Sequence, residues 1–115
     1  MEHYTETLPQ SLLETLCEKG MLEAKRYLLR GVTRDASSIV DTPNYGICFE
    51  WFDNNGIAVG VTRDFKRENV FRGYVWRKYT PDKILSFEEL QPICFFCNTW
   101  HEAANAAIEK ALTLI

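Results

Sequence analysis

Two cysteines and a histidine near the C-terminal end form a pattern that resembles a metal site: Cys94 and Cys97, separated by two phenylalanines, and then His101. Zinc needs four converging ligands, and a Cys-x-x-Cys pair supplies two of them from a tight turn. Residues 93–97 are apolar throughout, which is typical of a short inner strand. Because side chains three positions apart in a strand point to opposite faces, the two sulfurs cannot converge. We therefore expect no metal and no disulfide here.

The same cysteines do not fit redox chemistry of the thioredoxin type. That chemistry places the reactive thiol at a helix N-terminus, where the helix dipole lowers its pKa. Two residues, Asn98 and Thr99, separate Cys97 from a helix that is expected to begin at Trp100. We interpret Cys94 and Cys97 as packing residues on opposite sides of a strand. At least one should be buried, and replacement by alanine should cost on the order of 1 kcal/mol each.

Positive charge gathers in residues 63–79, which hold six basic and two acidic residues, a balance of +4, while the rest of the chain carries −7. Strand alternation places every second residue from 72 to 78 on one face, including Tyr74 and Trp76. A basic sheet face with exposed aromatic rings is one way in which proteins hold single-stranded nucleic acid. The candidate nucleic-acid contacts are Arg63, Lys66, Arg67, Arg72 and Lys78.

Two other interpretations of these aromatic residues stay open. Aromatic side chains in excess of what a core needs mark protein interfaces, and Phe65, Tyr74 and Trp76 are the candidates for such contacts. Alternatively, Tyr74 and Trp76 are core residues under a helix, and the aliphatic stems of Arg72 and Lys78 reach from the strand ends to water. Exposure of the two rings beside basic side chains favours nucleic acid, and burial favours the core.

Catalytic pairings are missing from the sequence. His3 falls in an N-terminal tail, and His101 falls in the first turn of a helix, where the dipole disfavours an imidazolium. The acidic residues show no spacing typical of a carboxylate pair, and there is no glycine-rich phosphate loop. We expect neither enzymatic activity nor a cofactor. The leading hypothesis is a non-enzymatic accessory protein acting through protein-protein interaction or self-association, and the alternative is a nucleic-acid-binding module using residues 63–79.

Composition indicates an ordinary globular protein. The 115 residues are 46% hydrophobic and 25% charged, enough for a single domain spanning residues 1–115. The net charge of −3 argues against a protein that coats nucleic acid or anionic membrane with its whole surface. No apolar run approaches the roughly 20 residues that span a bilayer, and the first residues do not resemble a signal peptide. We expect a cytoplasmic protein.

Three helices are predicted. The first follows a capping pattern at Thr7–Gln10 and runs to about Lys19, with Gly20 ending it in the left-handed conformation. Residues 21–30 favour a second helix that Gly31 ends. The third begins after Thr99, whose side chain caps the NH of Glu102. Its buried face comprises Trp100, Ala104, Ala107, Ile108, Ala111 and Ile115.

Strands are predicted at residues 45–52, 57–62, 70–79 and 93–97. Asn55-Gly56 between the first two indicates a hairpin, and the short connection at 63–69 makes the next pair antiparallel. A helix beginning at Thr42-Pro43 is the alternative for the first strand. Residues 32–43 and 80–90 are expected as loops. The predicted fold is α+β: a small antiparallel sheet of three or four strands, with N-terminal and C-terminal helices packed on it.

The layout of residues 42–57, a basic hairpin and the Ala-rich helix at 99–112 resembles small uncharacterised bacterial proteins carried by prophages and conjugative elements. The similarity covers about half the chain. It rests on a central hairpin and a terminal helix, so it implies an accessory role for a mobile element and no established reaction. No catalytic or binding residue follows from it.

Overall fold

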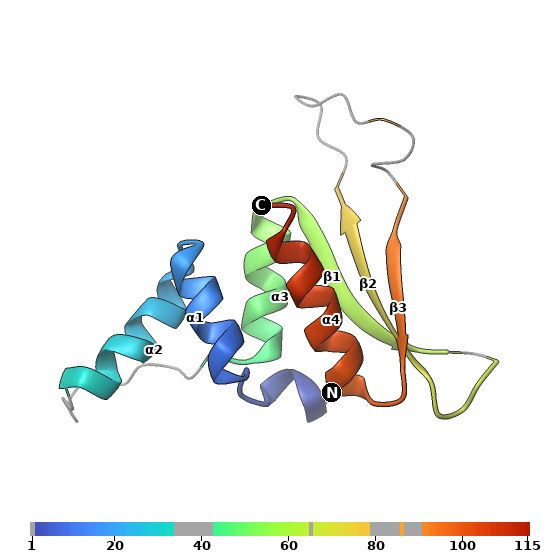
Figure 1. Ribbon diagram of the computed structural model, residues 1–115, viewed down its shortest axis with the longest axis horizontal. Coiled ribbons are helices and arrows are strands. Elements are labelled where there is room, and N and C mark those ends of the chain that lie inside the picture. The colour runs from blue at the N-terminus through green and yellow to red at the C-terminus, as the bar shows by residue number, and fades with distance from the viewer. Residues whose placement is uncertain (1, 34–42, 65, 79–85, 87–90) are drawn as a thin grey trace. The chain divides into compact units, whose positions relative to one another are not determined.

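A computed structural model describes residues 2–33, 43–64, 66–78, 86 and 91–115 (Figure 1). The predicted α+β class is confirmed. The chain divides into two compact units, residues 1–48 and 49–115, and a single domain over 1–115 stays a prediction. The elements in chain order are η1 (Glu2–Thr5), α1 (Gln10–Glu18), α2 (Leu22–Thr33), α3 (Tyr45–Asn54), β1 (Ile57–Arg63), β2 (Phe71–Arg77), β3 (Ile93–Cys97) and α4 (Trp100–Leu112).

The first unit contains the helix pair α1 and α2. Gly20 adopts φ +95° and ends α1 as predicted. Its NH donates to the carbonyl of Cys17, and the next NH, of Met21, donates to the carbonyl of Leu16. This is a Schellman motif, and the side chains of Met21 and Leu16 are fully buried, as the motif favours. The glycine therefore turns the chain directly into α2.

Two predictions for this unit were wrong. The side chain of Thr7 does not cap α1. The helix begins after Pro9, whose carbonyl accepts from the first turn, and Thr7 instead forms a β-bridge with Asn44. Gly31 does not end α2, which continues to Thr33, because glycine weakens a helix interior without forbidding it. The loop expected at 32–43 falls largely on residues 34–42, outside the described part of the chain.

The strand predicted at 45–52 is wrong, because these residues form α3. The side-chain oxygen of Asn44 accepts the NH of Ile47 at 2.8 Å and caps the first turn. The buried residues have helical spacing: Tyr45, Cys48, Phe49 and Phe52. Burial of this stripe outweighs the strand preference of the individual aromatic residues.

The hairpin predicted around Asn55-Gly56 is also wrong, since α3 ends there. The NH groups of Asn55 and Gly56 donate to the carbonyls of Phe52 and Asp53, so both close the last turn of the helix. Gly56 then takes φ +81°, a conformation that glycine adopts without steric cost. The same dipeptide that favours a tight hairpin thus connects a helix to strand β1.

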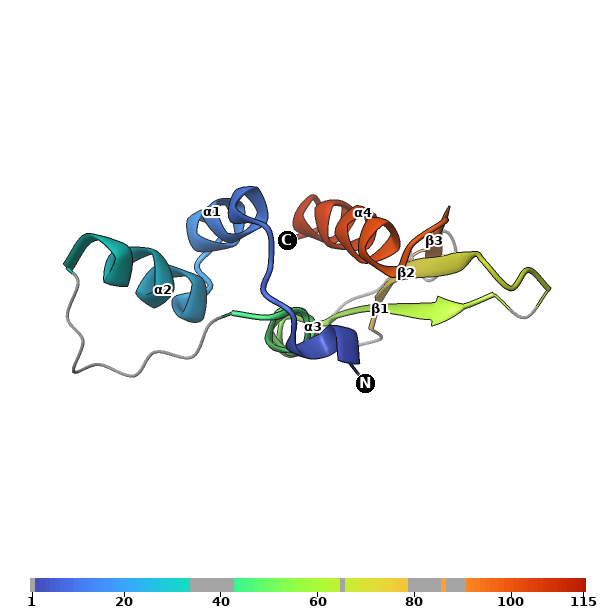
Figure 2. The same cartoon turned by 90° about the horizontal axis from the view of Figure 1, so that it is seen from below.

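The second unit contains an antiparallel sheet of order β1-β2-β3. The predicted strands at 57–62, 70–79 and 93–97 are confirmed: β3 has the predicted bounds, β1 continues one residue further, and β2 spans the shorter range Phe71–Arg77. Helix α4 lies along one face of the sheet (Figure 2). Val59 pairs with Val75 on that face, and both are buried. Residues 80–90, expected as a loop, lie outside the description except for Ser86.

Helix α4 begins as predicted, with the Thr99 hydroxyl accepting the NH of Glu102 at 3.1 Å. Trp100 is buried, and its ring lies 6.3 Å from that of Phe49 between centroids. Ile115, predicted on the buried face, is exposed because the helix ends at Leu112. The buried residues of the helix are Trp100, Ala103, Ala104, Ala107, Ile108, Ala111 and Leu112.

Candidate functional site

The sheet face opposite α4 carries the residues that the sequence marked as candidate contacts. The strand register places eight residues on this surface, which we call the distal face: Ala58, Gly60, Thr62, Arg72, Tyr74, Trp76, Cys94 and Phe96. Two large rings are exposed on it, Trp76 at 50% and Phe96 at 54%. Arg72 is exposed directly opposite Phe96. None of the eight residues carries a negative charge.

The ring of Tyr74 lies across the backbone of Gly60, its partner in the register. A Cβ at position 60 would overlap the Tyr74 hydroxyl and stand 3.0 Å from the ring carbon Cε1. Gly60 therefore leaves the space that the ring occupies, and Tyr74 is half-buried. Because β1 contributes only Ala58, Gly60 and Thr62, no large side chain of this strand projects from the distal face.

The β1–β2 turn adds a second arginine to the distal face. The guanidinium carbon of Arg67 lies 5.2 Å from the centre of the Phe96 ring, within the range of a cation–π contact. Arg67 Nε also donates to Asp64 Oδ2 at 2.8 Å. This hydrogen bond lowers the pKa of Asp64, and the NH of Lys66, which donates to Asp64 Oδ1, contributes in the same direction. Asp64 therefore stays ionised beside Arg67.

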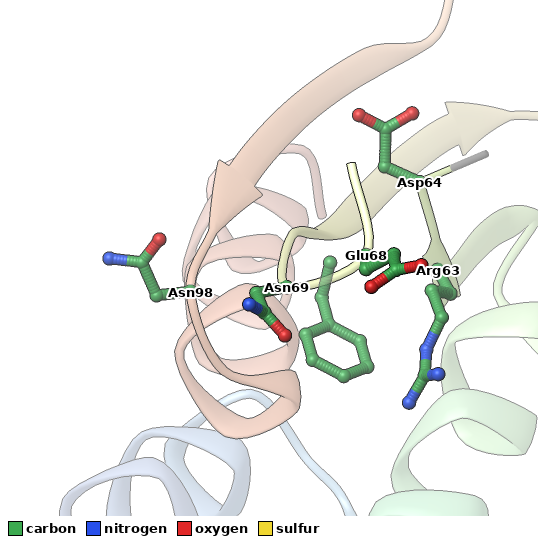
Figure 3. A pocket seen from close by; sticks show the side chains of 6 residues that line it. Arg63, Asp64, Glu68, Asn69 and Asn98 are labelled. Atoms are coloured by element: carbon green, nitrogen blue, oxygen red, sulfur yellow. The ribbon is translucent and has the colours of Figure 1, made fainter. Parts of the chain in front are cut away.

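Arg63, another candidate contact, lies on the other side of the sheet. Its guanidinium carbon is 5.4 Å from the ring centre of Phe71, and both residues belong to the α4 side by register. They line a pocket of about 550 Å³ with Asp64, Glu68, Asn69 and Asn98. Figure 3 shows Arg63 and Asp64 leaving the end of β1 in opposite directions. Charges of both signs line this pocket.

The other sequence candidates have separate locations. Lys78 follows β2 and forms an ion pair with Asp53, so it is drawn toward the end of α3. Lys66 is exposed in the β1–β2 turn, and Phe65 lies outside the described residues. The structure thus brings together Arg72, Tyr74 and Trp76, adds Arg67 from the turn, and leaves Arg63 and Lys78 elsewhere.

Phe96 belongs to the distal face but was not among the sequence candidates. The alternation of Ile93–Cys97 places it on one face with Cys94. Which face that is depends on the pairing of Phe96 with Arg72, and this register has no local signal in the sequence. The missed residue was therefore recognisable as a strand position but not as a neighbour of Arg72.

The two cysteines of β3 confirm one prediction and overturn another. Cys94 lies on the distal face and Cys97 on the α4 side, as strand geometry requires. The expectation that at least one is buried is wrong, because Cys94 is exposed and Cys97 is half-buried. An edge strand has a neighbour on one side only, which leaves its side chains more accessible. The absence of a bound metal stays a prediction.

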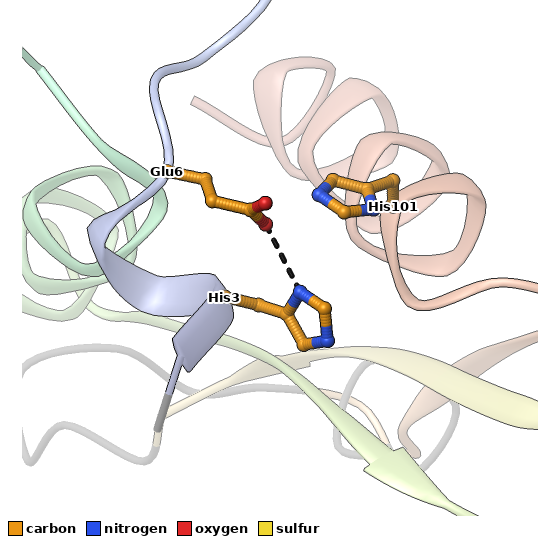
Figure 4. Close-up of side chains that lie close together, drawn as sticks. All are labelled: His3, Glu6 and His101. Carbon is orange, nitrogen blue, oxygen red and sulfur yellow. Dashed lines mark hydrogen bonds and ion pairs between the residues drawn. The ribbon is translucent and has the colours of Figure 1, made fainter.

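His101 lies in the first turn of a helix as predicted, but His3 does not lie in a tail. His3 belongs to η1 rather than to a frayed tail, and its Nδ1 lies 3.0 Å from Glu6 Oε2 (Figure 4). His101 is half-buried in the first turn of α4, and its ring meets that of Trp100 edge-on at 5.4 Å. Each ring is thus engaged with a neighbour from its own element or the residues next to it.

Comparison with protein-family models, with curated proteins and with solved structures finds no match to this chain. None of the described helices is both long and apolar enough to cross a membrane. Functional inference therefore rests on the geometry and chemistry of the distal face.

Proposed function

We propose that the distal face binds single-stranded nucleic acid, with Tyr74, Trp76 and Phe96 stacking on bases and Arg72 contacting phosphate. The observation that carries this proposal is the exposure of Trp76 and Phe96 on one sheet face beside Arg72. Aromatic rings stack on every base, and arginine pairs with phosphate, so the combination is suited to a strand of any sequence.

The three rings form a diagonal line across two strands. Tyr74 and Trp76 are two residues apart on β2, which separates them by roughly 7 Å. Phe96 pairs with Arg72, so it lies one strand over and two residues beyond Tyr74. This order, Trp76 to Tyr74 to Phe96, matches the path of an extended strand whose successive bases are splayed onto rings.

The charge distribution supports nucleic acid despite the overall acidity of the chain. The net charge is −3, but the distal face and the adjoining β1–β2 turn hold three of the six basic residues of 63–79, Arg72, Lys66 and Arg67. Binding is therefore expected only at this locus and should weaken steeply with salt. A protein partner is the competing explanation, since aromatic residues and arginine are also enriched at protein interfaces. On the distal face β1 contributes only small side chains, so few groups project from this part of the surface. We expect such a surface to suit flat bases better than the protruding side chains of a folded protein partner.

Binding is measured by fluorescence anisotropy of a labelled single-stranded oligonucleotide at several salt concentrations. We expect a log-log slope of about −0.7 per phosphate neutralised. Trp76→Ala should weaken binding by about tenfold, the cost of one lost stack. The triple variant Lys66→Glu, Arg67→Glu, Arg72→Glu should abolish it. A matched triple reversal in the first unit, Lys19→Glu, Lys25→Glu, Arg26→Glu, has the same net charge and should retain binding.

Four outcomes contradict the proposal. The first is a wild-type protein that does not bind the oligonucleotide at low salt. The second is an equal loss in both triple variants, which would mean that only net charge matters. The third is self-association in light scattering that Trp76→Ala abolishes, which would assign the distal face to a protein interface. Preference for the duplex form of the same sequence would replace single strands by double-stranded nucleic acid as the ligand.

A further inference from the structure

We infer that the guanidinium of Arg67, held over Phe96, is itself a base-stacking position that extends the line of rings on the distal face. This inference rests on the proposed function and assigns a specific subsite within it. Nucleobases stack on arginine guanidinium planes as well as on aromatic rings. The subsite lies at the end of the line away from Trp76, where the β1–β2 turn meets the start of β2.

Two contacts hold Arg67 in place. Its guanidinium carbon lies 5.2 Å from the Phe96 ring centre, and its Nε donates to Asp64 Oδ2 at 2.8 Å. The second oxygen of Asp64 accepts the NH of Lys66 at 3.4 Å, which ties the carboxylate to the turn. The nitrogen that donates to Asp64 is Nε. Arg67 is thus positioned before any ligand arrives, which lowers the entropic cost of using it.

The ion pair also changes what Arg67 contributes. The negative charge of Asp64 compensates the guanidinium, and the lowered pKa of Asp64 keeps that compensation in place at neutral pH. A phosphate therefore gains less from Arg67 than from Arg72. What Arg67 retains is a flat, weakly hydrated surface, a property that lysine does not share. Shape rather than charge should decide the effect of its replacement.

The test compares Arg67→Lys, which keeps the charge but not the plane, with Arg67→Ala in the oligonucleotide assay. Both should weaken binding by about tenfold, the cost of one stack, and the salt slope of Arg67→Lys should equal that of the wild type. Arg63→Lys is the matched control, because Arg63 also covers a phenylalanine ring but belongs to the α4 side. It should leave the dissociation constant unchanged.

A double variant tests whether the two residues act as one unit. The double variant Phe96→Leu, Arg67→Lys should bind the oligonucleotide no more weakly than the weaker-binding of the two single variants. Without the ring to support the guanidinium, the change at Arg67 has nothing further to remove. Wild-type affinity in Arg67→Lys, with a loss in Arg67→Ala, would reduce Arg67 to a point charge and overturn the inference. That result leaves the proposed function standing, whereas a wild-type protein without affinity refutes the proposed function itself.

Discussion

The backbone carbonyl of Ala103 in α4 lies directly over Gly73 in β2. A Cβ at position 73 would overlap the carbonyl oxygen of Ala103 and stand 2.9 Å from its carbonyl carbon. The helix can therefore approach the sheet only because this strand residue has no side chain. Gly73 is thus a position of close approach between α4 and the middle strand.

Gly73→Ala should lower the free energy of unfolding by about 1–3 kcal/mol, the usual cost of overpacking, because the obstacle is helix backbone. This loss must appear although alanine is the better strand residue in isolation. Gly60→Ala is the contrasting control: its Cβ meets the far end of the Tyr74 side chain, which can swing away. Gly60→Ala should fold nearly as stably but bind the oligonucleotide more weakly. Urea denaturation measures the free energy of unfolding of the two variants. Equal stability of Gly73→Ala and Gly60→Ala would contradict the close approach of α4 to Gly73.

The cap of α3 predicts a second effect on stability. Asn44→Ala removes the acceptor for the NH of Ile47 and should cost about 1 kcal/mol. Asn44→Asp keeps an acceptor at the helix N-terminus and should retain most of the stability. Urea denaturation monitored by circular dichroism gives both values. A loss of the same size in both variants would show that something other than the cap is being measured.

The sequence predicted those elements whose local signals and packing agree. Thr99 caps α4 and Gly20 ends α1 because each terminus satisfies its own backbone groups, whatever the rest of the chain does. The alternating apolar residues of Ile57–Arg63 similarly specify a strand with one buried face. In each case the residues of a short segment are enough to determine the local structure.

The failures occur where two local patterns compete. Residues 45–52 satisfy strand alternation and helical spacing together, and only the packing of Tyr45, Cys48 and Phe52 decides between them. The candidate site shows the same limit. Tyr74 and Trp76 were identifiable from β2 alone, but the arrival of Arg67 over Phe96 depends on the β2–β3 register and on the shape of a turn.

Cys48 makes a prediction about pH. Burial raises the pKa of its thiol from 9.0 to about 12. The folded state therefore keeps a proton that the unfolded state releases above pH 9, so stability is fully present below pH 9 and falls as pH rises toward 12. This one group should lower the free energy of unfolding by about 1.4 kcal/mol per pH unit in that window.

Denaturation of wild type and Cys48→Ala at pH 8 and pH 10 isolates this effect, since other groups titrate equally in both proteins. The wild type should be the more stable at pH 8, because alanine leaves a small cavity. The difference between the free energies of unfolding of the two proteins should be smaller at pH 10, because only the wild type has the thiol that favours unfolding there. Parallel losses in both proteins would mean that the Cys48 thiol is accessible to water.

Cys94 offers a chemical test of the distal face. It is exposed and pairs with Tyr74 in the register, so an adduct on its sulfur would stand beside the stacking rings. With Cys17 and Cys97 replaced by alanine, Cys94 and the buried Cys48 remain, and only Cys94 should react with N-ethylmaleimide at neutral pH. The alkylated protein should bind the oligonucleotide about tenfold more weakly, through lost stacking.

The matched control replaces Cys94 by alanine in the same background. Because Cys94 is exposed, this change should alter the free energy of unfolding by less than about 0.5 kcal/mol. For a buried thiol the expected loss would be on the order of 1 kcal/mol. Treated with the same reagent, the control should keep its affinity, so any loss in the parent is due to the adduct. Alkylated parent protein that binds with unchanged affinity would place the ligand away from β3 and remove Phe96 and Arg67 from the binding surface.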